Sequence, residues 1–222
     1  MSAHLAPFWA LRQHRRGPPP HEYFEPGTEQ ANRARWEVDS FEEYLACVLA
    51  TGTTENGVFA ASVMWPSFAG LLDRIGDRNV TMIERTFPHP RFAFLWRENV
   101  VAQAVSWSRA AQIGYYHQWD TAHEEATFDP EQIDALVGKA SENQAAWRRW
   151  FDAHDIEALP IRFEELVRDK EATALRVLAF LGIELPEGAT IRERTARAPD
   201  AGDEDWVARY RSLRSSLPRD RA

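Results

Sequence analysis

The stretch from Phe92 to Gln118 constrains the fold of this chain more than any other. It begins with the apolar run Phe92–Trp96, which predicts a short buried strand. Arg97 and Asn99 follow in a polar turn, and asparagine is a residue type that caps helices. From Val100 onward apolar residues recur at helical spacing, which predicts a long amphipathic helix. A strand that runs into a helix places their junction at the carboxyl end of a sheet, where open α/β sheets bind ligands.

Arg97 is the candidate binding residue at this junction. Its guanidinium group matches the geometry of phosphate or sulfate, and the helix N-terminus that follows favours anions. The alternative is an Arg97 that pairs with an acidic side chain at the surface. This stretch alone leaves both interpretations open.

Apolar runs and amphipathic segments alternate along the rest of the chain. Further strands are expected at Val58–Trp65, Val80–Glu84 and Ala158–Phe163. Helices are expected at Ser40–Ala50, with Glu43 completing a capping box, and at Pro66–Ile75, Pro130–His154, Glu164–Leu181 and Asp203–Ser215. The alternation predicts an α/β fold with a mostly parallel sheet, in which Phe92–Trp96 lies between Val58–Trp65 and Ala158–Phe163.

The composition bounds the kind of protein. The 222 residues contain no repeat or linker, which predicts a single domain spanning residues 1–222. A net charge of -8 argues against nucleic acid as a partner, although a local basic pocket for a small anion remains compatible with it. No apolar run reaches transmembrane length, so no membrane partner is expected. Arginines 12, 15 and 16 follow the early apolar patch, the reverse of a signal peptide, and the cytoplasm is therefore the expected location.

Metal and thiol chemistry are not expected. Cys47 is the only cysteine, so it forms no internal disulfide, and its apolar neighbourhood predicts an inert buried thiol. His117, Asp120 and His123 lie close together in the sequence, but their spacing matches no familiar ligand pattern.

The segment HEYFEP, residues His21 to Pro26, is predicted to be a loop bracketed by prolines. It combines a histidine, two carboxylates and two aromatic rings. A carboxylate beside aromatic walls can serve as a general base, which makes Glu22 a catalytic candidate. The alternative is a solvated acidic loop without a catalytic role.

A series of local patterns resembles the sulfotransferase family, in particular the bacterial trehalose sulfotransferase type. The segments that carry the resemblance are HEYFEP, NGVFAASVMW, FLWRENVVAQAVSWSRA, WRRWFDAHDI with the later FLGI, and RTARAPDAGDEDWVARYR. FLWRENVVAQAVSWSRA is the most specific of them, since it is similar to the family's R-P-D-V-V-x-Q-A-V-S-x-W-R-A. Together the patterns extend from about Leu11 to Arg211.

The resemblance implies a fold and an activity. The fold would be a P-loop-kinase-like three-layer sandwich in a single domain, without its first strand. The activity would be transfer of a sulfuryl group from 3′-phosphoadenosine 5′-phosphosulfate (PAPS) to a hydroxyl of a small-molecule acceptor. Arg97 and Ser106 would hold the 3′-phosphate, Arg197 would lie in the loop that closes over the nucleotide, and Glu22 would take the proton from the acceptor hydroxyl.

The sequence also departs from the family pattern on the donor side. The family's phosphosulfate loop, S-Q-R-S-G-S-T, falls opposite Met1–Leu5, where its Arg, Gly, Ser and Thr are replaced. A different start site would account for the missing strand but not for these replacements. Ser62 stands where the family has a lysine, and Trp96 where it has a histidine. The second hypothesis is therefore a sulfotransferase fold that no longer uses PAPS, acting as an acid/base enzyme or as a binding protein.

The acceptor and the assembly stay open. Aromatic residues that either line an acceptor site or belong to the core are Tyr23, Phe24, Trp65, Trp107, Tyr115, Tyr116 and Trp119. A sheet that has lost its edge strand would expose backbone amides, and these could pair with a second copy in a homodimer.

Overall fold

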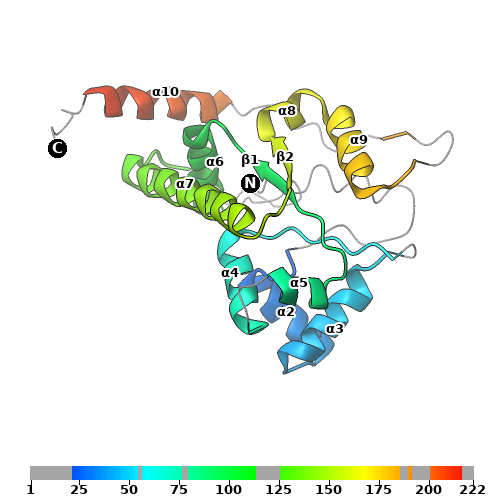
Figure 1. Ribbon diagram of the computed structural model, residues 1–222. Helices are drawn as coiled ribbons and strands as arrows, with labels where there is room; N and C mark the ends of the chain where they lie inside the picture. Colours follow the sequence, from blue (N-terminus) through cyan, green and yellow to red (C-terminus); the bar gives the residue numbers. More distant parts are fainter. Residues whose placement is uncertain are drawn as a thin grey trace. The chain divides into compact units, whose positions relative to one another are not determined.

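A computed structural model describes residues 22–54, 57–76, 80–113, 126–185, 190–191 and 201–216 (Figure 1). The chain divides into two compact units. The larger unit comprises Ala3–Trp96 and Asn143–Arg194, and the smaller one comprises Met1–Ser2, Arg97–Glu142 and Thr195–Ala222.

The larger unit contains the strands and most of the helices. Its elements are α2 (Pro26–Trp36), α3 (Phe41–Gly52), α4 (Trp65–Arg74), α5 (Val80–Thr86), β1 (Ala93–Trp96), β2 (Leu159–Arg162), α8 (Phe163–Arg168), α9 (Lys170–Leu181) and the second half of α7 (Pro130–Ala153). The smaller unit contains α6 (Val100–Ile113), the first half of α7 and α10 (Ala201–Ser216). No helix in the described ranges is long and apolar enough to cross a membrane.

The two strands form a parallel pair, which confirms the predicted α/β class. Ala93 lies opposite Leu159 and Trp96 opposite Arg162. The chain turns into α8 directly after β2, and Ile161, Leu166 and Val177 pack together behind the pair. The predicted parallel neighbour at Ala158–Phe163 is thus confirmed.

Two other expected strands are wrong. Val58–Trp65 is not a strand, because Phe59 makes only an isolated antiparallel bridge to Thr53, and Trp65 already begins α4. A proline in the first helical turn favours that start, since its fixed φ suits a helix. Val80–Glu84 belongs to helix α5, which buries Ile83 in the core. A short apolar run does not distinguish a strand from one face of a short helix.

Capping residues set most helix boundaries. Ser40 and Glu43 form the predicted capping box at α3, and Asn99 Oδ1 accepts from the backbone N–H of Ala102 (3.1 Å) at the start of α6. The predicted helix Glu164–Leu181 is split in two, because the Asp169 side chain accepts from Ala172 N–H and caps α9 anew. Helix α2 was not predicted, although Glu25 caps it in front of a proline.

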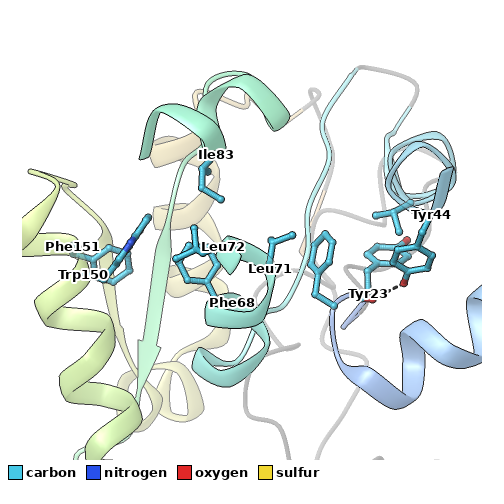
Figure 2. Close-up of a cluster of buried hydrophobic side chains, with 10 residues drawn as sticks. Tyr23, Tyr44, Phe68, Leu71, Leu72, Ile83, Trp150 and Phe151 are labelled. Carbon is cyan, nitrogen blue, oxygen red and sulfur yellow. Dashed lines mark hydrogen bonds between the residues drawn. The ribbon is translucent and has the colours of Figure 1, made fainter. Parts of the chain in front are cut away.

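Aromatic side chains dominate the core of the larger unit (Figure 2). Phe68 of α4 stacks on Trp147 and meets the edge of Trp150, with ring centroids 4.6 and 4.7 Å apart. Phe92 and Phe151 pack on the same group. Such contacts stabilise a core beyond the burial of apolar area alone.

The smaller unit has its own core between α6, α7 and α10. Ala104, Val105, Ile133 and Tyr210 are buried there. The Tyr210 hydroxyl donates to Asp134 (2.7 Å), and Arg109 forms an ion pair with Asp203 (2.6 Å). The C-terminal helix is therefore fixed to the other two by polar as well as apolar contacts.

Candidate active site

The segment that carries Glu22 is a tight turn in front of α2. The backbone N–H of Glu25 donates to the carbonyl of Glu22 (3.0 Å), and the Glu25 carboxylate caps the helix by accepting from Thr28 N–H (2.7 Å). Burial acts to raise the pKa of Glu25, but the hydrogen bonds from Thr28 and Gly27 outweigh it, so the pKa lies below its ordinary value. The turn is thus tied to the helix that follows it.

One oxygen of the Glu22 carboxylate is buried. The residue is half-buried, and its Oε1 atom is buried without a hydrogen-bond partner among the described residues. Buried carboxylate oxygens are normally hydrogen-bonded, so a buried oxygen that accepts no hydrogen bond needs an explanation. An oxygen with a free lone pair and little water around it is suited to accept a proton from a hydroxyl group.

The two aromatic residues after Glu22 belong to the core. Tyr23 and Phe24 are 2% and 3% exposed. The Tyr23 ring stacks on Phe59, which stacks on Phe87, with centroids 5.9 and 5.7 Å apart. The sequence did not decide whether these aromatic residues belong to the core or to an acceptor site. Tyr23 and Phe24 belong to the core, next to the half-buried Glu22 in the sequence.

Helix α3 contacts the turn at two points. The Tyr44 hydroxyl donates to the carbonyl oxygen of Tyr23 (2.5 Å). Two turns later Gly52 approaches so closely that a Cβ there would lie 3.0 Å from the Tyr23 hydroxyl oxygen and 2.7 Å from the Phe59 ring. Burial raises the pKa of the Tyr44 hydroxyl, which keeps it protonated as a donor.

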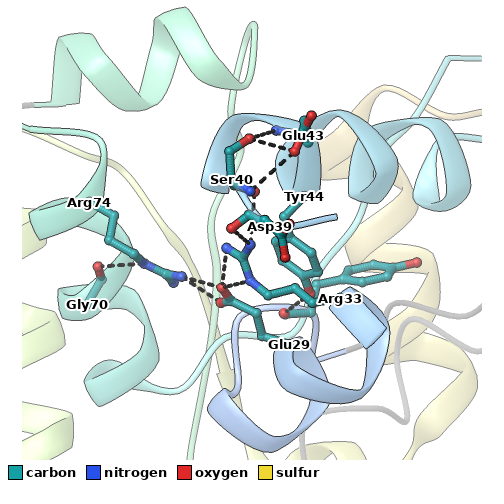
Figure 3. A network of polar contacts seen from close by, with 9 residues as sticks. Glu29, Arg33, Asp39, Ser40, Glu43, Tyr44, Gly70 and Arg74 are labelled. Carbon is teal, nitrogen blue, oxygen red and sulfur yellow. Dashed lines mark hydrogen bonds and ion pairs between the residues drawn. The ribbon is translucent and has the colours of Figure 1, made fainter. Parts of the chain in front are cut away.

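A network of charged side chains lies beside Tyr44 (Figure 3). Glu29 accepts from Arg74 through both carboxylate oxygens (2.7 and 2.6 Å) and pairs with Arg33 (2.8 Å). Arg33 also donates to the carbonyls of Asp39 (2.8 Å) and Ser40 (2.9 Å). Its guanidinium carbon lies 4.9 Å from the centroid of the Tyr44 ring. Helices α2, α3 and α4 are thereby joined around one carboxylate.

Two of the predicted anion-binding residues, Arg97 just before α6 and Ser106 within it, belong to the smaller unit. Arg97 is half-buried, and its Nη1 donates to the carbonyl of Ala102 (3.3 Å). Ser106 is half-buried further along the same helix. Arg211 of α10 donates to Asn99 Oδ1 (3.1 Å), which brings a third polar group to this junction. Sequence reasoning did not single out Arg211.

Other predicted site residues are buried or lie outside the described residues. Ser62, which stands where the family pattern has a lysine, is 6% exposed. The Arg148 guanidinium carbon lies 5.0 Å from the centroid of the Trp96 ring. Arg197 and the stretch 1–21 are outside the described residues, as are the histidines at 117 and 123. Within the described ranges no group of three or more His, Cys, Asp or Glu residues could hold a metal ion.

Comparison with known proteins decides the family. A sequence model described as Stf0 sulphotransferase matches residues 11–213, which is most of the chain. The chain belongs to the Stf0 sulphotransferase family. The chain is also similar to two enzymes named trehalose 2-sulfotransferase, which confirms the resemblance seen in the local patterns.

The two relatives come from mycobacteria. The chain is 30% identical over 175 residues to the enzyme of Mycobacterium tuberculosis, covering 74% of this chain and 65% of the relative. It is 28% identical over 192 residues to that of Mycolicibacterium smegmatis, covering 80% and 69%. The chain thus spans just under two thirds of the length of the first relative.

Within this Stf0 family member, sequence reasoning missed the residues that support Glu22. Tyr44 and Gly52 lie on the inner face of α3, where a helical apolar pattern indicates burial but not what is contacted. Ser108 was missed as well. It is fully buried, it donates to Gln132 Oε1, and Gln112 joins the pair. Cys47 is half-buried rather than buried as expected.

Proposed function

We propose that this chain transfers a sulfuryl group from PAPS to a hydroxyl of a small-molecule acceptor, with Glu22 as the general base. Membership of the Stf0 sulphotransferase family supports the reaction class. The relatives are named for trehalose, so trehalose is the first acceptor to test. A single domain, a cytoplasmic location and a homodimer remain part of this proposal.

The observation that carries the proposal is the buried oxygen of Glu22 that accepts no hydrogen bond. A general base must reach the proton that it abstracts and must not be occupied by another donor. Glu22 Oε1 is buried and accepts no hydrogen bond from any described residue. The next two residues, Tyr23 and Phe24, are themselves buried in the core.

The chemistry needs one proton acceptor and one place for a polyanion. Glu22 would take the proton of the acceptor hydroxyl. In the same step the oxygen of that hydroxyl would bond to sulfur, and the bond from sulfur to the phosphate oxygen of the nucleotide would break. Arg97, Ser106 and Arg197 would hold the 3′-phosphate, since a guanidinium fork and a hydroxyl suit a phosphate dianion. This nucleotide, when bound, supplies the sulfuryl group.

The first test is the substitution Glu22→Gln, which keeps the shape of the side chain and removes its basicity. Transfer of labelled sulfate from PAPS to trehalose is expected to slow by about 100-fold or more, the usual contribution of a general base. Glu42→Gln is the matched control, because Glu42 is exposed on α3. Full activity of correctly folded Glu22→Gln would remove Glu22 from the mechanism.

A second candidate function has its own supporting observation. Ser62 is buried and carries no charge at the position where the family pattern has a lysine. This favours a protein that binds or converts a small molecule without PAPS, with Glu22 as an acid or base. The two candidates differ in whether the nucleotide binds.

Calorimetry with 3′-phosphoadenosine 5′-phosphate separates the candidates. Under the first proposal the nucleotide binds, and Arg97→Ala weakens it by about 10- to 100-fold, the range expected when a charged hydrogen bond is lost. Arg168→Ala is the control, since Arg168 is exposed at the end of α8. Absence of heat with the unmodified protein would favour the second candidate.

A further inference from the structure

We propose that Tyr44 is a positioning residue for Glu22, holding the turn from which the carboxylate extends. The proposal rests on the proposed role of Glu22 as the general base. Tyr44 itself touches neither reacting atom. It acts through the backbone of the neighbouring residue, Tyr23.

Two consecutive carbonyl groups of the turn are held by hydrogen bonds. The carbonyl of Glu22 accepts from the backbone N–H of Glu25 (3.0 Å). The next carbonyl, that of Tyr23, accepts from the Tyr44 hydroxyl (2.5 Å), which comes from a residue 21 positions later (Figure 2). Fixing two successive peptide planes restricts the φ and ψ angles of Tyr23 between them. Because the Cα of Glu22 lies in the first of these planes, fixing that plane also holds in place the point from which the Glu22 side chain extends.

Tyr44 supplies this hydrogen bond from a rigid place. Its side chain is fully buried, and its ring packs against Trp36 with centroids 5.6 Å apart. Arg33 covers the ring and is itself held by Glu29 and by the carbonyl groups before α3. The donor therefore has little freedom to follow a moving turn.

Glu22 depends on this support because its own side chain has little. Glu22 Oε1 accepts no hydrogen bond from the described part of the chain, so packing and the backbone that carries the side chain, and not a hydrogen bond of its own, hold that oxygen in place. A displacement of about 1 Å between reacting groups can cost a rate factor of about 100. Loosening the turn is expected to lower turnover more than it weakens binding of the substrates.

The test compares two tyrosines that lose the same atom. Tyr44→Phe is expected to lower kcat by about tenfold or more with KM for PAPS nearly unchanged. Tyr210→Phe also removes a buried hydroxyl that donates a hydrogen bond, to Asp134. It leaves the hydrogen bond from Tyr44 to the Tyr23 carbonyl intact, so it is expected to change kcat by less than about twofold. Equal losses in the two variants would assign the effect to general destabilisation and overturn the proposal.

A double-mutant cycle links the effect to Glu22. Once Glu22→Gln has removed the base, Tyr44→Phe should lower kcat no further, whereas fully additive losses would contradict the proposal. Reduced turnover in Glu22→Gln with normal turnover in Tyr44→Phe would overturn the positioning role alone. Full turnover in Glu22→Gln would overturn both.

A readout independent of catalysis completes the test. Amide hydrogen exchange at Glu25, whose N–H donates to the Glu22 carbonyl, should accelerate in Tyr44→Phe and not in Tyr210→Phe. Incorporation of 4-aminophenylalanine in place of Tyr44 keeps an N–H donor at this point and should restore both exchange and turnover. The 4-aminophenylalanine variant also provides a test of the proposal if Tyr44→Phe does not fold. Unchanged exchange at Glu25 would show that the hydroxyl does not hold the turn.

Discussion

Glu29 is the residue on which the charged network of the larger unit depends. Its side chain is 12% exposed and lies between two guanidinium groups, 2.6 Å from Arg74 and 2.8 Å from Arg33. A carboxylate this buried is costly unless it is paired and hydrogen-bonded. Both arginines also stack on rings, Arg74 over Phe41 and Arg33 over Tyr44, so Glu29 orients two cations that cover aromatic surface.

Glu29→Gln should therefore destabilise the fold. The change keeps the shape of the side chain but leaves both arginines without their counter-charge. A loss of about 1 to 3 kcal/mol is expected, since the arginines keep some access to water and charged hydrogen bonds contribute on this scale. Urea denaturation measures it, with the exposed Glu42→Gln as control. An unchanged unfolding midpoint would show that the network contributes no net stability.

One face of helix α3 carries both a hydrogen-bond donor and a glycine that has no side chain. Tyr44 near its beginning provides the hydroxyl, and Gly52 at its end leaves room for the rings of Tyr23 and Phe59. Neither residue would suffice alone, because a longer residue at position 52 would push away the residue that Tyr44 holds. The helix is thus the local scaffold for the turn that carries Glu22.

Gly52→Ala tests this fit. Its Cβ would lie 2.7 Å from the Phe59 ring, so buried aromatic groups must move. Overpacking of this kind costs about 1 to 3 kcal/mol and outweighs the roughly 1 kcal/mol by which alanine favours a helix. Gly138→Ala in α7 meets nothing within 4 Å and should instead stabilise by about 0.4 to 1 kcal/mol. Thermal unfolding of both variants shows whether each substitution raises or lowers the stability of the fold. A stabilised Gly52→Ala would disprove the close approach.

At the scale of the whole molecule, the sequence predicted what depends on local signals. The capping residues Ser40 and Asn99 act as expected, and the parallel pairing of β1 with β2 followed from two apolar runs with helices between them. Val80–Glu84 was misassigned because its apolar residues suit a strand or one face of a buried helix equally. Val58–Trp65 was misassigned because an apolar run does not show whether a sheet partner is present, and Phe59 forms only an isolated bridge.

The site was predictable only in part. Glu22 and Arg97 could be selected from their residue types and from the family patterns. They lie in different compact units, so their joint action in one reaction stays part of the proposal. Tyr44 could not be found from sequence, because its partner is a backbone carbonyl 21 residues away and a carbonyl group has no sequence signature.

The aromatic core described above also gives the larger unit a distinctive optical signature. The indole rings of Trp65, Trp147 and Trp150 lie in one cluster, with centroid separations of 5.3 Å for the first two and 6.1 Å for the last two. Chromophores this close and held at fixed angles couple electronically, so we expect them to contribute strongly to the near-ultraviolet circular dichroism of the folded unit. That signal disappears when side chains lose their fixed packing, even where helices persist. The unit thus carries its own spectroscopic reporter of tight packing without any added label.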